Sequence, residues 1–257
     1  MTPVVFFVVL LSLTAVPPGA ADEGDDGDSS QDVSEVIARA NANITTKLIY
    51  DDIAPNTKRN AVPCTAIGCK WRKRGRYVTV PYTISSEYST DERNFIIKTL
   101  ESFHQSTCVR FQMRTSRQFT YLHFFSGTGC WSFLGRQIGK QLVSLKKNGC
   151  LHTSTVQHEV LHALGFHHEQ VRSDRDDYVN INYNNIKFET QYNFWKIWTN
   201  NLGTPYDFQS VMHYSKYAFS KNGQPTIVAK SDPKLNFGHA TTLSANDIAR
   251  VNRLYKC

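Results

Sequence analysis

The side chains with the clearest chemistry lie in one run, His158-Glu159-Val160-Leu161-His162-Ala163-Leu164-Gly165-Phe166-His167-His168. Histidines four residues apart lie about one turn apart on one face of an α-helix, where two neutral imidazoles can bind one Zn²⁺ at about 2.0–2.1 Å. Gly165 can end that helix with a positive φ, so that the chain turns back and brings His168 to the same ion. Three protein ligands and one open position are typical of a catalytic zinc site.

Glu159 follows the first of these histidines and is placed to take a proton from a water at the metal. Two histidines at this spacing also occur by chance on polar helix faces, so the short pattern alone is weak evidence. Here all five fixed positions of the longer pattern H-E-x-x-H-x-x-G-x-x-H are filled, which makes chance a poor explanation. The spacing selects His168 and not His167 as the third ligand.

The elements that must hold these residues follow from hydrophobic patterning. The metal-binding run predicts a helix from about 153 to 164. β-branched and aromatic residues predict strands at 77–84, 109–113, 120–125 and 142–145, and Pro81 suggests that the first is an edge strand. Helices are predicted after the capping box at Ser89–Glu92, near 34–42 and from about Ser244.

Composition indicates a secreted protein. Val4 to Val16 is almost wholly apolar and is followed by small residues, which predicts a signal peptide at 1–21 that is too short to span a bilayer. No later stretch is apolar enough to span, so we expect no stable membrane insertion. Six cysteines predict three disulfides, which could pair in 15 ways. Cys64 and Cys69 are close enough to form a small loop, and the alternative, zinc binding by cysteines, is disfavoured by the absence of a CxxC pair.

Charge divides the chain near residue 59. Residues 22–59 hold nine acidic and four basic side chains, whereas the residues after 59 hold 25 basic and 13 acidic ones. An acidic pro-segment lying on a basic enzyme is electrostatically sensible, and the basic part could favour an acidic extracellular matrix or envelope. The alternative is a solvated basic surface without a specific partner. Nucleic acid is not an expected partner of a secreted disulfide protein.

Two longer motifs carry a family resemblance. The run from His158 to His168 continues as Glu169-Gln170-Val171-Arg172-Ser173-Asp174-Arg175-Asp176 and resembles the extended signature of the astacin family of zinc endopeptidases. Ser210-Val211-Met212-His213-Tyr214 is similar to the Met-turn of that family. The resemblance covers roughly residues 48–257, and six cysteines without an appended domain resemble the group that contains fish hatching enzymes.

The resemblance implies an α+β catalytic domain of the zincin (metzincin) type, with two subdomains split by an active-site cleft and a mixed sheet beside the active-site helix. It implies one Zn²⁺ per subunit, bound by His158, His162 and His168, with Glu159 as the catalytic base. Tyr214 would be a fifth ligand that swings away and hydrogen-bonds the transition state. Met212 would pack beneath the metal without coordinating it.

The resemblance also implies activation from a zymogen, with a signal peptide at 1–21, a pro-segment at 22–59 and a catalytic domain at 60–257. Asp52 matches the aspartate that binds zinc in the latent form, although the family's preceding glycine is Asp51 here. Cleavage after Arg59 would create a new N-terminus that is buried near Glu169. The disulfides implied by the family are Cys108–Cys257 and Cys130–Cys150, beside Cys64–Cys69.

These observations predict a secreted zinc endopeptidase that hydrolyses extracellular matrix or egg-envelope proteins, acts as a monomer and is stored in secretory granules before release. A digestive or tissue-remodelling protease would use the same chemistry elsewhere. A catalytically silent binding protein is disfavoured by the intact Glu159 and three histidines, and a structural or storage zinc role by the open coordination position. Ala240 stands where many members carry a basic residue, which predicts a weaker preference for acidic residues after the scissile bond.

Overall fold

A mixed β-sheet and the helix α4 (Thr153–Leu164) form the first half of the molecule. The computed structural model describes residues 1, 32–45, 47–55 and 69–257. The predicted signal peptide, the cleavage site at Lys58-Arg59 and Cys64 lie outside these residues. The strands are β1 (Ile53–Ala54), β2 (Lys73–Arg74), β3 (Tyr77–Ile84), β4 (Val109–Met113), β5 (Tyr121–Phe125), β6 (Cys130–Phe133) and β7 (Lys140–Leu145).

The sheet has the order β1-β6-β7-β5-β3-β2, and β4 pairs with β3 beside this path. β3 runs parallel to β4 and β5, and β5 runs parallel to β7, whereas β6 pairs antiparallel with β7. β1 belongs to the N-terminal segment of the chain and adds to β6 in parallel, with Ile53 opposite Ser132 and Ala54 opposite Phe133. Without β1, the strand β6 would be the edge of the sheet on the side of α4.

The edge position expected for the strand that contains Pro81 is wrong. β3 pairs with β4 over Val78–Tyr82 on one side, and on the other side with β2 at residues 77–78 and with β5 from Tyr82 onward. The second side therefore has no ladder partner at Pro81. The strand tolerates the missing N–H in the interior of the sheet because Pro81 falls in this gap between two ladders.

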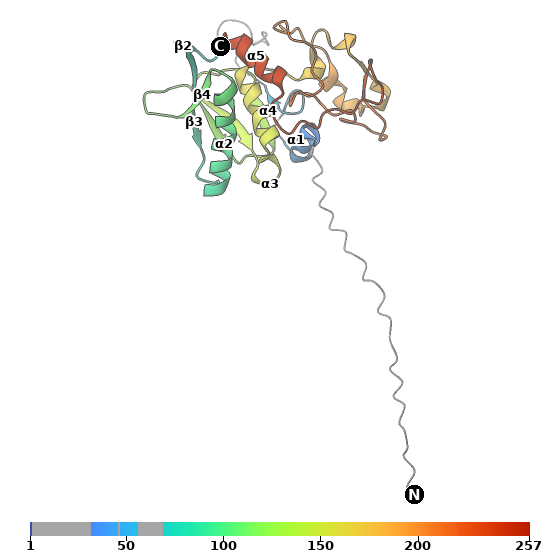
Figure 1. The fold of residues 1–257 in the computed structure, drawn as a ribbon, viewed down its shortest axis with the longest axis horizontal. Helices are drawn as coiled ribbons and strands as arrows, with labels where there is room; N and C mark the ends of the chain where they lie inside the picture. The colour runs from blue at the N-terminus through green and yellow to red at the C-terminus, as the bar shows by residue number, and fades with distance from the viewer. Residues whose placement is uncertain (2–31, 46, 56–68) are drawn as a thin grey trace.

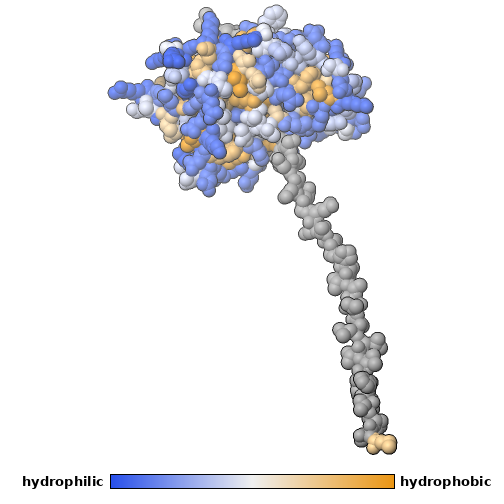
Figure 2. All heavy atoms as spheres, in the orientation of Figure 1, coloured by the Kyte–Doolittle hydropathy of each residue, from blue (hydrophilic) through white to orange (hydrophobic). Residues whose placement is uncertain are grey.

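Two helices pack beside the sheet and beside each other, namely α4 and α2 (Thr90–Ser106). α2 begins with the predicted capping box, in which Ser89 accepts the amide of Glu92 and the Glu92 carboxylate accepts the amide of Ser89. Ile96, Leu100 and Phe103 recur at helical spacing and are fully buried in the main core. Hydrophilic side chains cover much of the visible face of the molecule, with separate apolar patches between them (Figure 2).

The second half of the molecule contains mostly irregular chain and short helices (Figure 1). Its two strands, β8 (Val179–Ile181) and β9 (Ile227–Ala229), form a separate antiparallel pair. A second apolar cluster around Phe194, Ile227 and Phe237 supports this half. Its remaining helical elements are the 3₁₀ turns Glu169–Val171, Arg175–Asp177, Tyr183–Asn185 and Phe188–Phe194. The final helix α5 (Ala245–Tyr255) returns to the first half. The Cys108–Cys257 disulfide links the segment after this helix to the residue before β4.

The N-terminal segment lies between the two halves. Its helix α1 (Val33–Asn41) packs against α4, β6 and the short helix α3 (Lys147–Cys150), near the Cys130–Cys150 disulfide (Figure 1). Val33 and Ile37 belong to the main core cluster. In the part of the chain that the structure describes, no helix combines the length and apolar character needed to cross a membrane.

Candidate metal centre and active site

α4 carries His158, Glu159 and His162 on a buried helix whose last turn is firmly capped. Gly165 ends the helix with a φ of 110°, and its N–H donates to the carbonyls of Leu161 and His162. The next two carbonyls accept side-chain donors, with Trp71 Nε1 2.9 Å from the Ala163 oxygen and the Tyr255 hydroxyl 2.8 Å from the Leu164 oxygen. The last turn of α4 therefore leaves no carbonyl unsatisfied, which holds His162 in place.

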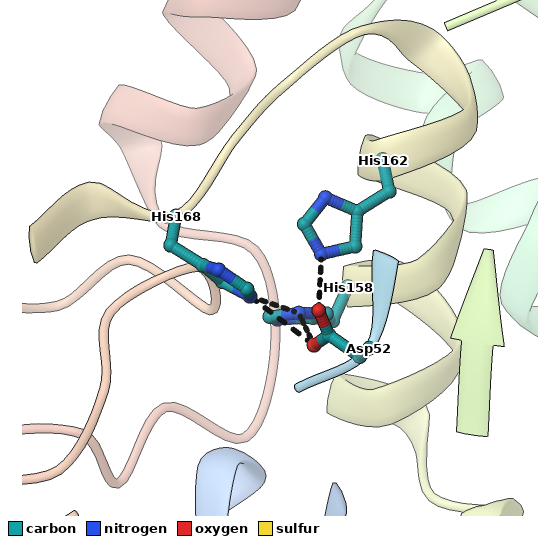
Figure 3. Close-up of side chains that lie close together, drawn as sticks. All are labelled: Asp52, His158, His162 and His168. Atoms are coloured by element: carbon teal, nitrogen blue, oxygen red, sulfur yellow. Dashed lines mark hydrogen bonds and ion pairs between the residues drawn. The ribbon is translucent and has the colours of Figure 1, made fainter. Parts of the chain in front are cut away.

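Three imidazoles converge on one carboxylate (Figure 3). Asp52 Oδ2 lies 2.9 Å from His158 Nε2 and 3.1 Å from His168 Nε2, and Asp52 Oδ1 lies 3.4 Å from His162 Nε2. These four side chains form a buried group whose ligand atoms all lie within 4.8 Å of one another. His167 is not part of the group and instead makes an edge contact with the ring of Tyr50.

The hydrogen bonds made by Nδ1 determine which tautomer His158 and His162 adopt. His158 Nδ1 lies 2.7 Å from the Val211 carbonyl, and His162 Nδ1 lies 2.7 Å from the Phe166 carbonyl. A carbonyl only accepts, so each Nδ1 carries the proton and each neutral ring directs the lone pair of Nε2 inward. Burial lowers the pKa of His162 and lowers that of His168 to about 4, so the neutral, metal-binding form is favoured at neutral pH.

This donor set fits a zinc ion. His158 Nε2 and His168 Nε2 lie 3.3 Å apart. Two nitrogens at about 2.05 Å from a tetrahedral zinc are separated by about 3.3 Å, which is the same spacing. Nε2 of His162 and Oδ1 of Asp52 are buried and have no hydrogen-bond partner among the described residues. A cation between these inward lone pairs would satisfy all of them.

The Glu159 carboxyl lies beside this group and is shielded from solvent. It is fully buried, and neither of its oxygens has a hydrogen-bond partner among the residues described. Burial raises the pKa of Glu159 well above its ordinary value, and the negative charges of Asp52 and Asp51 raise it further. A carboxyl with a raised pKa is suited to accept a proton and to return it within one reaction.

The segment around Met212 contacts the metal-binding segments through its backbone. Met212 is buried in the main core, and its carbonyl accepts the amide of Glu169 at 2.9 Å, next to His168. Asp247 on α5 holds this segment by accepting from the Ser210 hydroxyl at 2.6 Å and the Val211 amide at 3.1 Å. The ring of Tyr214 lies 4.7 Å from that of His168, but its hydroxyl donates to the Tyr50 carbonyl at 2.8 Å instead of facing the carboxylate.

Glu169 lies behind the third histidine in a network of charged side chains. Its carboxylate accepts from both terminal nitrogens of Arg250, from Arg172 at 3.2 Å and from the Asp207 amide at 2.8 Å. A cavity of about 90 Å³ borders Glu169, Arg172 and Arg250. Asn60, whose amino group was expected to approach Glu169 after cleavage, lies outside the described residues.

Two of the three expected cysteine pairs are present in the structure. Cys108 is linked to Cys257, and Cys130 is linked to Cys150. Cys69 is also in a disulfide, while its expected partner Cys64 lies outside the described residues.

Four residues that the sequence reasoning missed help to form the site: Asn41, Trp71, Asp247 and Tyr255. Only Asp247 had a local sequence signal, because Ser244 and Asp247 form a capping box at the start of α5. The other three act through partners far away in the chain, such as the Cys130 backbone, which Asn41 contacts from 89 positions away.

A buried three-histidine group on a helix–turn, with a carboxyl beside it and a methionine segment in contact with it, defines a zinc peptidase of the metzincin type. The sequence matches the family model of the astacin peptidases over residues 67–256. The chain belongs to the astacin family and is a zinc metalloendopeptidase.

Two relatives from the medaka fish Oryzias latipes are similar over most of their length. High choriolytic enzyme 1 is 43% identical over 234 residues, which cover 90% of this chain and 86% of the relative. Low choriolytic enzyme is 39% identical over 264 residues, which cover 98% and 97% of the two chains. The solved structure of high choriolytic enzyme 1, described as a hatching enzyme zinc-protease, matches with a TM-score of 0.73 and 45% identity, covering 77% of this chain and 100% of that one.

Proposed function

We propose that this chain is the secreted zymogen of a hatching protease that digests egg-envelope proteins. The observation that carries the latent state is the Asp52 carboxylate among the three histidine nitrogens, within 3.4 Å of each of them. The similarity to choriolytic enzymes over nearly the whole chain supports the hatching role. A protease of digestion or tissue remodelling is the main alternative to that role.

The proposed chemistry divides between a metal and the residues around it. When bound, zinc polarises the peptide carbonyl and makes a water more acidic. His158, His162 and His168 hold the metal as neutral imidazoles. Glu159 accepts the proton of the attacking water and returns it to the leaving amine. The hydroxyl of Tyr214, once freed from the Tyr50 carbonyl, donates to the oxygen that gains charge in the transition state.

In the latent form Asp52 occupies the position that a water would need. Burial alone would raise the pKa of Asp52, but its contacts with His168 and His162 lower that pKa well below its ordinary value, which favours the charged carboxylate there. Cleavage after Arg59 would release residues 22–59 and start the catalytic domain at Asn60. The new amino group would then approach Glu169, where the cavity next to Arg172 and Arg250 offers space.

The decisive experiment compares the activated wild type with Glu159→Ala, each incubated with isolated egg envelope and with casein, with and without a zinc chelator. Wild type alone should digest both substrates, and the chelator should stop it. Zinc content of the two proteins, measured by elemental analysis, should be equal because Glu159 is not a ligand. Digestion of casein with an untouched envelope would retain the peptidase and remove the hatching role.

A further inference from the structure

The N-terminal segment makes a second set of contacts that does not involve the metal ligands. Residues 32–45, which include α1, precede Asp52 and contact the catalytic part through polar contacts at each end of the helix and through apolar side chains between them. None of the hydrogen bonds or ion pairs of these described residues involves His158, His162, His168 or Glu159.

At the C-terminal end of α1, Asn41 binds the backbone of the strand β6. Its Oδ1 accepts the Cys130 amide at 2.8 Å, and its Nδ2 donates to the Cys130 carbonyl at 2.8 Å and to the Asp51 carbonyl at 3.0 Å. The side-chain amide thus pairs with one residue of the edge strand as a peptide group of an added strand would. Asn41 is 5% exposed, so these hydrogen bonds are shielded from water.

The strand is shaped to receive this amide. Gly129, just before Cys130, has a φ of 76°, and a Cβ there would lie 1.9 Å from Asn41 Oδ1. A side chain at Gly129 would therefore fill the place that the Asn41 amide occupies.

At the N-terminal end of α1, Ser34 contacts the other half of the molecule. Its hydroxyl accepts the Ser215 amide at 3.0 Å and donates to Asp32, the N-cap residue, at 2.8 Å. Ser215 directly follows Tyr214, whereas Cys130 lies on the sheet, so α1 joins the two halves of the molecule (Figure 1). Between these ends, Val33, Val36 and Ile37 are 1%, 4% and 1% exposed.

From these contacts we propose that the surface covered by α1, which includes Gly129, Cys130 and Ser215, is a binding site of the catalytic domain that is independent of zinc, and that the excised segment 32–45 binds there in trans as an inhibitor after activation. The proposal rests on residues 22–59 being removed on activation, as proposed above. The ligand is an amphipathic helix with a hydroxyl near its N-terminus and an asparagine at its C-terminus. Bound there, it bridges both halves of the molecule and excludes extended substrates.

A direct test uses fluorescent peptides of residues 32–45, which lack Asp52. The receptor is the full chain carrying Glu159→Ala, cleaved after Arg59 by an added protease and freed of its pro-segment, so that it cannot digest the probe. Anisotropy titrations are run with the zinc-loaded and the chelator-treated receptor. The dissociation constants should agree within about twofold, because no metal ligand takes part.

Matched peptides test whether the Asn41 hydrogen bonds contribute to binding. Asn41→Ala should weaken binding by at least about tenfold, because buried donors and acceptors lose their partners. Asn43→Ala makes the same chemical change two residues later, where the side chain is exposed, and should bind like the wild type. Equal effects of the two substitutions, or loss of binding when zinc is removed, would overturn the proposal.

A second peptide is used because the free-energy cost of forming a short helix in solution could hide the binding of the first peptide. The peptide 32–55 with Asp52→Ala adds the β1 contacts, and absence of binding by both peptides would also overturn the proposal. In the uncleaved full chain, Asp52→Ala with Asn41→Ala should hydrolyse a peptide substrate at least about fivefold faster than Asp52→Ala with Asn43→Ala. An inactive enzyme after complete cleavage would instead refute the proposed function, while the binding titration would still report on α1.

Discussion

Replacement of Arg250 by methionine should destabilise the fold, because it removes the main partner of a buried carboxylate. Glu169 is 1% exposed and accepts from both terminal nitrogens of Arg250. Breaking a buried ion pair by removing one partner costs about 3–5 kcal/mol. Arg172 and the Asp207 amide still contact Glu169, so we expect the lower end of this range, about 3 kcal/mol. In a domain of about 150–250 residues this lowers Tm by about 6–12 °C.

The assay is differential scanning calorimetry of the full chain, with Glu159→Ala in every variant to prevent proteolysis. Arg253→Met is the matched control, because Arg253 lies on the same helix, is exposed and, among the described residues, donates only to the Leu202 carbonyl at 2.8 Å. Its Tm should change by less than about 2 °C. Adding Glu169→Gln to Arg250→Met should recover part of the loss, since a neutral amide needs no counter-charge. Equal Tm shifts for Arg250→Met and Arg253→Met would refute the reasoning.

Three further predictions concern stability away from the metal. Replacing Cys130 and Cys150 by serine opens a loop with a sequence separation of 20 and should cost about 3 kcal/mol, measurable by urea unfolding. Phe103→Ala should cost about 3–5 kcal/mol in the same assay, because Phe103 is fully buried in the main core, and a cost near that of a surface change would contradict this packing. Burial lowers the pKa of His104, whose Nε2 accepts the Phe111 amide at 2.9 Å. The unfolded chain therefore binds more protons as pH falls below about 6.5, so stability should fall there, and His104→Gln should reduce this fall in Tm.

Local patterns predicted the elements that carry the chemistry. The helix from 153 to 164, the glycine that ends it and the capping box of α2 all depend on residues within a few turns of each other. The strand position of Pro81 could not be predicted, because it depends on where two other strands end beside β3. For the same reason no local pattern indicated that Asn41, Trp71 or Tyr255 belongs to the site, since each acts on a backbone group at least 89 positions away.

The predicted roles of the site residues have a similar limit. The spacing of His158, His162 and His168 predicts that they meet, because a helix and a tight turn determine their separation. The proximity of Asp52 depends on a chain crossing from 106 positions earlier, and only the family resemblance pointed to it. Its neighbours Tyr50 and Asp51 show how that crossing is made, because both have a positive φ, of 51° and 75°.

The left-handed conformations of Tyr50 and Asp51 also affect how easily the Asp52 segment dissociates from the active site. A left-handed conformation costs about 1–2 kcal/mol per residue relative to an ordinary backbone, so the tight turn before Asp52 is strained. Release of this strain favours dissociation of the segment once it is cut. The bound conformation is also unfavourable for the charged Asp51 carboxylate, since burial and the charge of Asp52 raise the pKa of Asp51 to about 7. Asp51→Gly, which restores the family's glycine, would lower the backbone strain at this turn. We expect a zymogen with less residual activity and a slower release of its pro-segment.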